Sequence, residues 1–315
     1  MVVWMAAVAR GATRYIQPQA RPLSRTRSPM HLTHTPSPLR TWSLTALAML
    51  AFAGNSLLCR MALQQTGFDP GSFTTIRLVS GALVLWLLVA SRGAGARPMA
   101  GSWASALALF TYAAGFSYAY VELSAGTGAL LLFGAVQATM ISFGLWSGER
   151  LALRQIAGLL CALAGLAGLL LPGLEAPPAG GAMLMLGAGV AWGVYSLRAR
   201  GAGDPTRVTA GNFVRTVPLA LVLCTATLPW ATPDLAGAAF AIASGAVASG
   251  LGYAIWYMAL GGLSATRAAS VQLSVPVIAA IGGMLMLGEP PSLRLVLASA
   301  AILGGIALVI VRRPV

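Results

Sequence analysis

The sequence predicts an all-α polytopic membrane protein with ten transmembrane helices, arranged as two inverted five-helix repeats. Three observations support this fold class: an apolar composition, ten apolar runs of membrane-spanning length, and a stretch of sequence that occurs twice. Of the 315 residues, 57% are hydrophobic and 9% are charged, whereas soluble domains carry about 25% charged residues. So little polar surface excludes a water-soluble fold, and we expect the chain to lie in a lipid bilayer.

The repeat emerges when the chain is compared with itself at a shift of 140 residues. Residues 118–171 then fall on residues 258–311, and both copies consist of an apolar run, a short polar break and a second apolar run. The break carries Gly-Glu in both copies, at Gly148-Glu149 and at Gly288-Glu289. One constant shift over such distant points indicates duplication of a unit of about 140 residues.

Residues 1–40 differ from the rest of the chain, with six arginines, several prolines and no acidic residue. They could pass for an Arg- and Ser-rich transit peptide. We favour a disordered cytoplasmic tail, or a start codon assigned too early. In the second case Met30 is the true start and residues 1–29 are not translated. Both histidines lie in this tail, where an exposed pair is favoured over a metal site.

The ten apolar runs begin at residue 42, and each is close to the ~20 residues that cross ~30 Å of hydrocarbon. The breaks between them are short and contain turn residues such as Asp69-Pro70 and Asp204-Pro205. Backbone groups in lipid must be hydrogen-bonded internally, so the runs should be helices. The predicted spans are 42–63, 70–90, 100–120, 124–146, 152–171, 181–198, 209–229, 236–258, 265–287 and 293–311.

The arginines predict the orientation. With the tail inside and ten alternating spans, sixteen of the 20 arginines lie on the cytoplasmic side and only Arg294 lies outside. The other three, Arg60, Arg77 and Arg215, fall within spans near their ends. We expect the protein in a bacterial inner membrane. Because cytoplasmic loops are enriched in Arg, both termini should lie on the cytoplasmic side. Five spans per copy is an odd number, so the second copy must be inverted. The repeats are residues 41–175 and 176–315.

Polar and aromatic side chains within the spans are candidates for a solute pathway. A charge deep in lipid costs about 2.5–3.5 kcal/mol on insertion scales, and buried polar groups usually face a cavity or a partner. Amides and aromatic walls suit a small amphipathic solute. The alternative for each residue is a structural bond between helices, worth about 0.6 kcal/mol. The candidates are Asn55, Tyr112, Gln137, Trp192, Tyr195 and Gln272.

Charged and aromatic residues near the span ends are open to two interpretations. Arg77 lies about seven residues into the second span. It is a further pathway candidate, because it could attract an anionic group; the alternative, which we favour, is extension to the interface. Trp256 and Tyr257 end the eighth span, where an interfacial aromatic belt explains them without function. Glu149 and Glu289 occupy matching breaks, and we interpret them as helix-start or loop anchors, with a gate as the alternative.

Three features of the spans occur together: Gly54-Asn55-Ser56 in the first, Asp69-Pro70 with Arg77 at the second, and Gly-Glu after the fourth and ninth. With these features, the chain resembles EamA-type members of the drug/metabolite transporter superfamily over residues 42–312. This resemblance implies export or exchange of amino acids and other small metabolites.

A proline about a dozen residues before Gly-Glu also belongs to the family pattern. Pro276 fits it in the second copy, and we include Pro276 among the pathway residues. The first copy departs from the pattern, because Val136 stands at this position with Gln137 beside it.

The residue types also exclude some functions. Every basic residue is Arg, so the chain lacks the Lys of a P-loop and the Lys of a retinal Schiff base. Cys59, Cys161 and Cys224 lie far apart in apolar runs and have neither metal nor disulfide spacing. We therefore expect no cofactor, no metal and no nucleic-acid partner. The expected partners are the lipid bilayer and a small-molecule solute.

Two inverted copies are the usual construction of secondary transporters, with the solute path at their interface. We therefore predict a transporter that exports or exchanges a small metabolite by alternating access, and no enzyme. The alternatives are a non-transporting membrane scaffold and an intramembrane enzyme. Glu122, at the outer end of the third span, is the nearest candidate for coupling to protons. The small-residue runs Gly158–Gly168 and Ala298–Gly305 could pack within one chain or form a homodimer.

Overall fold

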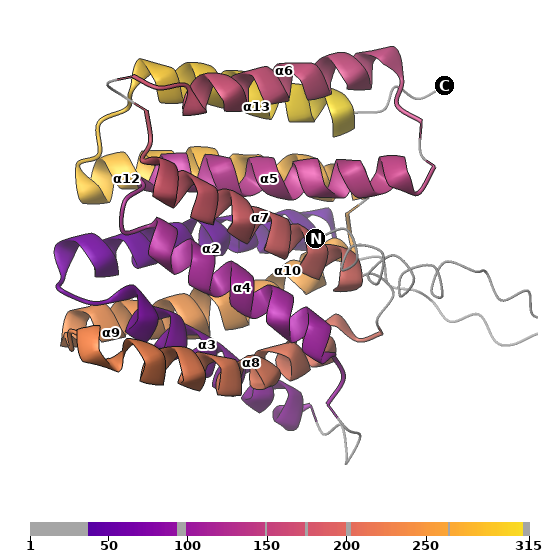
Figure 1. Cartoon of the computed structure of the whole chain (residues 1–315). Helices are drawn as coiled ribbons and strands as arrows, with labels where there is room; N and C mark the ends of the chain where they lie inside the picture. The colour runs from indigo at the N-terminus through magenta and orange to yellow at the C-terminus, as the bar shows by residue number, and fades with distance from the viewer. Residues whose placement is uncertain are drawn as a thin grey trace, which may run out of the picture.

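The computed structural model describes residues 37–92, 99–148, 150–173, 176–199, 203–263 and 265–310. These residues form helices and no strands, which confirms the predicted all-α class (Figure 1). The last described helix, α13, ends at the same end of the bundle as α2 begins. The long helices are α2 (Pro38–Gln65), α3 (Pro70–Ser91), α4 (Trp103–Ala119), α5 (Ala125–Trp146), α6 (Leu153–Leu170), α7 (Ala179–Ala199), α8 (Pro205–Thr227) and α13 (Leu293–Ile310).

Nine helical segments within the described ranges are long and apolar enough to cross a membrane, which confirms a polytopic membrane protein. The remaining predicted span, 100–120, corresponds to α4. This helix has 17 residues, or about 26 Å at 1.5 Å per residue. It packs along α7, so we count it as the tenth spanning helix.

The Asp-Pro breaks place the starts of α3 and α8. Asp69 accepts a hydrogen bond from the backbone N–H of Ser72 at 2.8 Å. Asp204 accepts one from the N–H of Thr206 at 3.0 Å. In each helix the proline that follows occupies the first position, where its missing N–H costs nothing. The predicted turn residues are therefore N-terminal caps.

The eighth and ninth spans are not continuous α-helices. The eighth consists of α9 (Leu235–Ile242), the π-helix η2 (Ala243–Leu251) and α10 (Gly252–Leu260). The ninth is divided into α11 (Ala265–Gln272) and α12 (Ser274–Leu287). Pro276 explains the second break, because its ring cannot donate a hydrogen bond to the carbonyl of Gln272 and clashes with it. Interrupted helices at membrane depth usually line a cavity.

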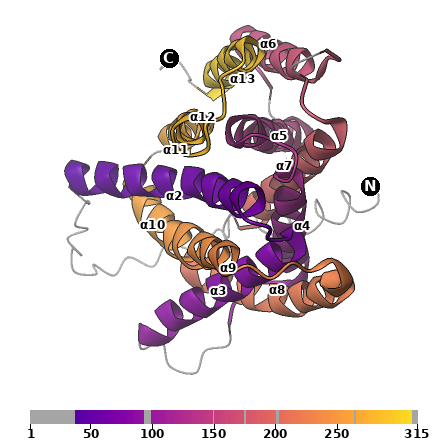
Figure 2. The ribbon, with the colours of Figure 1, turned by 90° about the vertical axis from the view of Figure 1, so that its left-hand side faces the viewer.

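Two pairs of equivalent helices pack antiparallel. Along α3 and α8, Gly71 lies against Thr227 and Gly81 against Phe213. The helices α6 and α13 form the second such pair. In the nearly end-on view of Figure 2, these two pairs lie at opposite edges of the bundle. Each pair joins a helix of one copy to its own equivalent in the other, as expected for inverted repeats. The exact repeat boundaries remain a prediction.

The helices between these pairs repeat one contact pattern. Gly115 of α4 lies against Ala188 of α7. The shift of 140 residues relates α4 to η2–α10 and α7 to α2, and Gly252 of α10 lies against Ala51 of α2. The inner helices of the two copies therefore enclose a common centre.

The small-residue faces of α6 and α13 pack on each other within one chain. A Cβ added at Gly158 would lie 2.5 Å from the carbonyl oxygen of Gly305, and one added at Gly165 would lie 2.7 Å from the Cβ of Ala301. One of the two predicted uses, packing within one chain, is therefore present. A homodimer through these helices stays a prediction.

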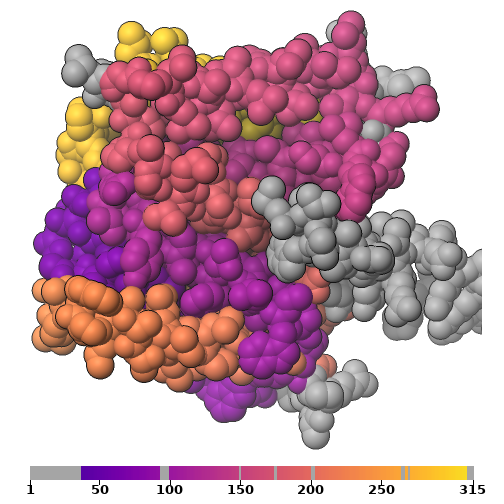
Figure 3. All heavy atoms as spheres, viewed as in Figure 1, coloured from indigo at the N-terminus to yellow at the C-terminus, as the bar shows by residue number. Residues whose placement is uncertain are grey.

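Large apolar side chains are exposed around the bundle, as expected for lipid contact. Figure 3 views the side that includes α4, α6, α7 and α8. Trp103 and Leu160 are among the exposed residues of α4 and α6, and Leu285 is 80% exposed on α12. Burying such residues in hydrocarbon is favourable, whereas leaving them in water is not.

Candidate functional site

A cavity of about 400 Å³ lies in the centre of the bundle, between the two copies. Its size falls within the usual range of small-molecule sites, about 300–1,000 Å³. Equivalent positions of α2 and α7 face it, since each of the following pairs is related by the shift of 140 residues. These pairs are Phe52 and Trp192, Asn55 and Tyr195, and Ser56 and Ser196.

Aromatic rings form a large part of the cavity wall. The ring centre of Trp192 lies 4.8 Å from that of Tyr112 and 5.3 Å from that of Tyr253. Phe52 contacts Tyr253 and Trp256 edge to face, at 5.8 and 5.9 Å. Such arrangements are favourable between aromatic rings, so these contacts stabilise the apolar wall.

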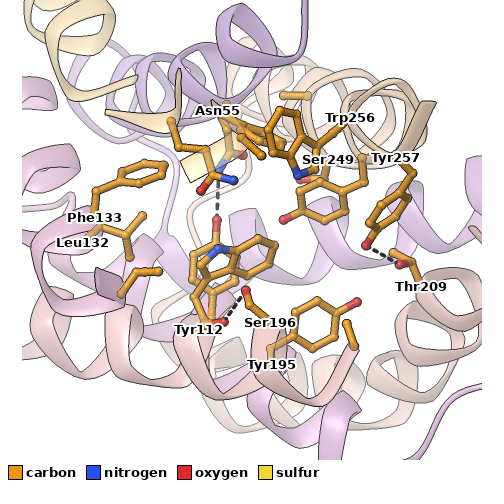
Figure 4. Close-up of a pocket in the computed structure, with 18 of the residues that line it drawn as sticks. Asn55, Tyr112, Leu132, Phe133, Tyr195, Ser196, Thr209, Ser249, Trp256 and Tyr257 are labelled. Carbon is orange, nitrogen blue, oxygen red and sulfur yellow. Dashed lines mark hydrogen bonds between the residues drawn. The ribbon is translucent and has the colours of Figure 1, made fainter. Parts of the chain in front are cut away.

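One part of the wall carries a network of polar side chains. The Nδ2 of Asn55 donates to the hydroxyl of Tyr112 at 3.2 Å, and the Nη2 of Arg77 donates to the same hydroxyl at 2.9 Å. Two serines of η2 complete the network, because Ser244 donates to the Oδ1 of Asn55 at 2.6 Å and Ser249 accepts from the Nε of Arg77 at 3.4 Å. Asn55, Tyr112 and Ser249 line the cavity (Figure 4).

Arg77 does not extend to the interface, so the interpretation favoured from the sequence is wrong. Its side chain is 2% exposed, and its guanidinium lies 5.1 Å from the ring centre of Tyr112 and 4.8 Å from that of Phe116. Hydrogen bonds and ring faces inside the bundle therefore replace interfacial water. Arg77 is not itself part of the cavity wall but lies directly behind Tyr112.

Gln137 and Gln272 both line the cavity. Neither amide takes part in any of the hydrogen bonds between described residues. For these two residues, the structure therefore shows no hydrogen bond between helices, which was the alternative considered from the sequence. Pro276 is buried in α12 and does not line the cavity; it lies beside the helix break that brings Gln272 to the wall. Glu149 lies outside the described residues.

Another part of the cavity wall contains residues that the sequence analysis did not assign to the solute pathway. Tyr257 and Thr209 are joined by a hydrogen bond of 2.8 Å between their hydroxyls (Figure 4), and Trp256 also lines the cavity. The aromatic-belt interpretation of Trp256 and Tyr257 is therefore wrong. The repeat could have revealed Trp256, since the shift relates it to Phe116, which also lines the cavity.

The cavity reaches one end of the bundle. Its lining includes the last residue of α7 and of α10, the first residue of α8, and a residue of α11. All of these lie at the end where α2 begins, because Thr41 of α2 contacts Gly262 in the turn between α10 and α11. The residues concerned are Ala199, Leu260, Pro205 and Ala268.

Side-chain contacts close the opposite end. Arg60 and Glu289 form an ion pair with 3.0 Å between Nε and Oε1, and their side chains are only 13% and 17% exposed. The other carboxylate oxygen of Glu289 accepts from the backbone N–H of Ala125 at 2.8 Å, at the first residue of α5. Arg60 also donates to the carbonyl oxygens of Tyr120 and Val121, at 2.8 and 3.1 Å. These bonds join α2, α5 and the end of α12.

Every acidic residue in the described ranges binds a backbone N–H at the start of a helix. Glu122 accepts from Gly181 of α7 at 2.8 Å, and Asp234 accepts from Gly237 of α9 at 2.7 Å. Asp69, Asp204 and Glu289 do the same at α3, α8 and α5. A carboxylate is stabilised there by free N–H groups and by the helix dipole. None of these acids lines the cavity.

The helices and the central cavity define a multi-pass membrane protein with an internal space for a small molecule. Comparison with known proteins agrees. The EamA-like transporter family matches residues 179–311, within the second predicted repeat. An uncharacterized protein of Pseudomonas aeruginosa is 59% identical over 274 residues, which cover 87% of this chain and 96% of the relative.

A second relative carries a functional description. A probable terminal-alkyne amino-acid exporter of Streptantibioticus cattleyicolor is 31% identical over 190 residues, covering 58% of this chain and 64% of the relative. Among solved structures, a crystal structure with 22% sequence identity has a TM-score of 0.63 and covers 87% of this chain and 98% of its own. The chain belongs to the EamA-like transporter family, within the drug/metabolite transporter superfamily.

Proposed function

We propose that this protein is a secondary transporter that exports or exchanges a small amphipathic metabolite, such as an amino acid, by alternating access of its two inverted halves. The observation that carries the proposal is the central cavity, which is lined by equivalent residues of both copies, reaches one end of the bundle and is closed at the other. Such a cavity is expected where a solute path runs between inverted repeats.

The cavity wall suits a solute with a polar head and an apolar body. Most of its surface is aromatic or aliphatic, and its polar groups are few and grouped. This combination orients a small molecule without holding it too strongly to be released. The amino-acid exporter among the relatives supports the same solute class.

The arginine distribution supports an orientation in which the open end of the cavity faces the bacterial cytoplasm. The state described here is then inward-facing, with the Arg60–Glu289 pair as the outer closure. The orientation predicts that a reporter fused after Val315 is active only on the cytoplasmic side and that one inserted at Pro178 is active only outside. A periplasmic C-terminus would contradict the ten-span inverted arrangement.

The transport function is tested with the purified full-length chain in proteoliposomes. Liposomes preloaded with amino acids, nucleobases or small amphiphiles should accumulate the labelled form of at least one of them by counterflow, above protein-free liposomes. Ser56→Trp, which fills the cavity, should abolish this flux. Leu160→Trp adds similar bulk to a residue of α6 that is 61% exposed and should leave the flux unchanged. Folded protein without flux would favour a scaffold or an enzyme.

A further inference from the structure

The polar network beside the cavity holds a positive charge that none of the described acidic residues balances. We infer that the Tyr112 hydroxyl, polarised by Arg77 and held by Asn55, recognises one carboxylate group of the transported solute. The inference rests on the proposed function, because it assigns a solute class to the same cavity.

The hydrogen bonds leave the Tyr112 hydroxyl with one proton to donate. Its oxygen already accepts from Arg77 at 2.9 Å and from Asn55 at 3.2 Å. Two accepted bonds use both lone pairs of a hydroxyl, so the O–H can only donate further. None of the hydrogen bonds between described residues uses this proton, and Tyr112 lines the cavity. A solute oxygen is therefore a suitable acceptor.

The orientation of Asn55 follows from its second partner. Ser244 donates to the Oδ1 of Asn55 at 2.6 Å, which directs the Nδ2 of the same amide toward Tyr112. Arg77 can only donate. Both groups that contact the Tyr112 oxygen are thus donors, and the network presents a donor, rather than an acceptor, to the cavity.

Charge determines which acceptor fits. Arg77 is buried, and its Nη1 has no hydrogen-bond partner. The one ion pair between described residues is that of Arg60 and Glu289 at the closed end, so no described acid neutralises Arg77. Bonds to charged acceptors are about twice as strong as bonds between neutral groups. One positive charge matches one carboxylate, whereas a doubly charged phosphate would leave a negative charge in the bundle.

The remaining wall describes the rest of the solute. No charged side chain lies among the described residues that line the cavity. The faces of Trp192, Tyr253 and Trp256 can contact an apolar side chain, and aromatic faces also attract an ammonium group. An amino acid or a related carboxylate with an apolar body meets both requirements, while a solute with only an amine lacks a partner for Tyr112.

The test compares solutes that differ only in the carboxyl group. Leucine, phenylalanine and tryptophan are each compared with their carboxamide, and the N-acetyl amino acids with the N-acetyl carboxamides, by thermal shift on the full-length protein in detergent. We expect carboxylates to bind about tenfold more tightly than the matching carboxamides, the size expected for a hydrogen bond to a charged group. N-acetylation, which removes the ammonium and keeps the carboxylate, should preserve this preference.

Two variants separate recognition from folding. Tyr112→Phe removes only the hydroxyl and should reduce the carboxylate preference at least fivefold. If the hydroxyl were purely structural, the variant would bind the carboxylate and the carboxamide more weakly by the same factor. Tyr257→Phe removes another hydrogen-bonded hydroxyl of the same cavity, away from Arg77, and should keep the preference. Equal binding of carboxylates and carboxamides by the wild type, or no binding of any carboxylate, overturns the inference without needing a variant.

Flux of the same compounds distinguishes the inference from the proposed function. Transport of carboxamides or amines as fast as carboxylates would overturn the carboxylate site and leave the transport function standing. Binding of carboxylates without any flux would overturn the transport function and leave the carboxylate site standing.

Discussion

At the level of single residues, the protein keeps its negative charges apart from its buried positive charge. The described acids bind backbone N–H groups at helix starts, where the helix dipole stabilises them. Arg77 lies instead inside the bundle, against the hydroxyl of Tyr112 and the ring of Phe116. An isolated charge in this position is costly. This buried charge is the basis of the carboxylate site that we propose.

The amides in the cavity wall provide the first residue-level prediction. Gln137→Ala and Gln272→Ala should each lower transport several-fold while leaving expression and melting temperature nearly unchanged. Both amides line the cavity and bond to no described residue, so their removal breaks no bond between helices. Flux per folded molecule in proteoliposomes is the measurement. Loss of folding with normal flux per folded molecule would show that the amides are structural.

The sequence was sufficient to predict which polar residues lie deep in the membrane. Six of the candidates, chosen from their depth in the spans, do line the cavity. The interpretation of Arg77 was wrong because the distance of a residue from a span end gives its depth in the membrane. It does not give the direction in which the side chain points. The same limit explains Trp256 and Tyr257, which are close to a span end but turn inward.

At the level of helices, the contact between α6 and α13 depends on glycine. Gly158→Ala should destabilise the protein by about 1–3 kcal/mol, the usual cost of overpacking a tight contact. The reason is that the new Cβ would lie 2.5 Å from the backbone carbonyl of Gly305, which cannot move aside alone. Thermal unfolding in detergent is the measurement, and the melting temperature should fall.

Gly168 of the same helix serves as the control, because a Cβ there meets nothing within 4 Å. Gly168→Ala should leave the melting temperature unchanged or raise it slightly, since alanine is favoured over glycine in a helix by about 0.5–1 kcal/mol. Equal melting temperatures for the two variants would mean that α6 and α13 do not pack closely.

Helix positions could be predicted because lipid requires long apolar runs with internal backbone bonds. The interruptions could not be predicted equally well. Pro276 is visible in the ninth run, and its effect on the carbonyl of Gln272 follows from its ring. The π-helix Ala243–Leu251 has no comparable signal, since its small residues also suit a regular α-helix.

At the level of the whole molecule, alternating access requires the closed end to open. Glu289→Gln keeps the shape of the side chain but removes the charge that binds Arg60. Loss of a charged hydrogen bond of about 1.5 kcal/mol should raise the population open at this end by about tenfold. Cys59, which is fully buried next to Arg60, reports such opening.

The measurement is the labelling rate of Cys59 by a membrane-impermeant maleimide in a Cys161→Ser, Cys224→Ser background. The Glu289→Gln variant should label several-fold faster than its parent. Asp234→Asn provides a control, because this acid caps α9 without an arginine partner. Unchanged labelling of Cys59 in Glu289→Gln would remove the ion pair from the gating mechanism.

The inversion of the two copies follows from an odd number of spans in each. Which helices touch could not be predicted, because a shift along the sequence gives equivalence and not contact. The structure supplies these contacts: α3 packs on α8 and α6 on α13, while the inner helices surround the cavity. Phe52 and Trp192 are equivalent in sequence and also face the same space.

Energy coupling is a property of the whole transport cycle. Proton-driven carriers commonly keep a titratable group within a span. The described acids lie at helix starts, and Glu122, the nearest candidate, binds the N–H of Gly181 at the start of α7 and does not line the cavity. We therefore predict facilitated diffusion or solute exchange without obligatory proton exchange. Solute accumulation is measured in proteoliposomes under an imposed pH gradient with the membrane potential clamped, and the gradient should drive none. Uphill accumulation that collapses with the gradient and is lost in Glu122→Gln would make Glu122 the coupling residue instead.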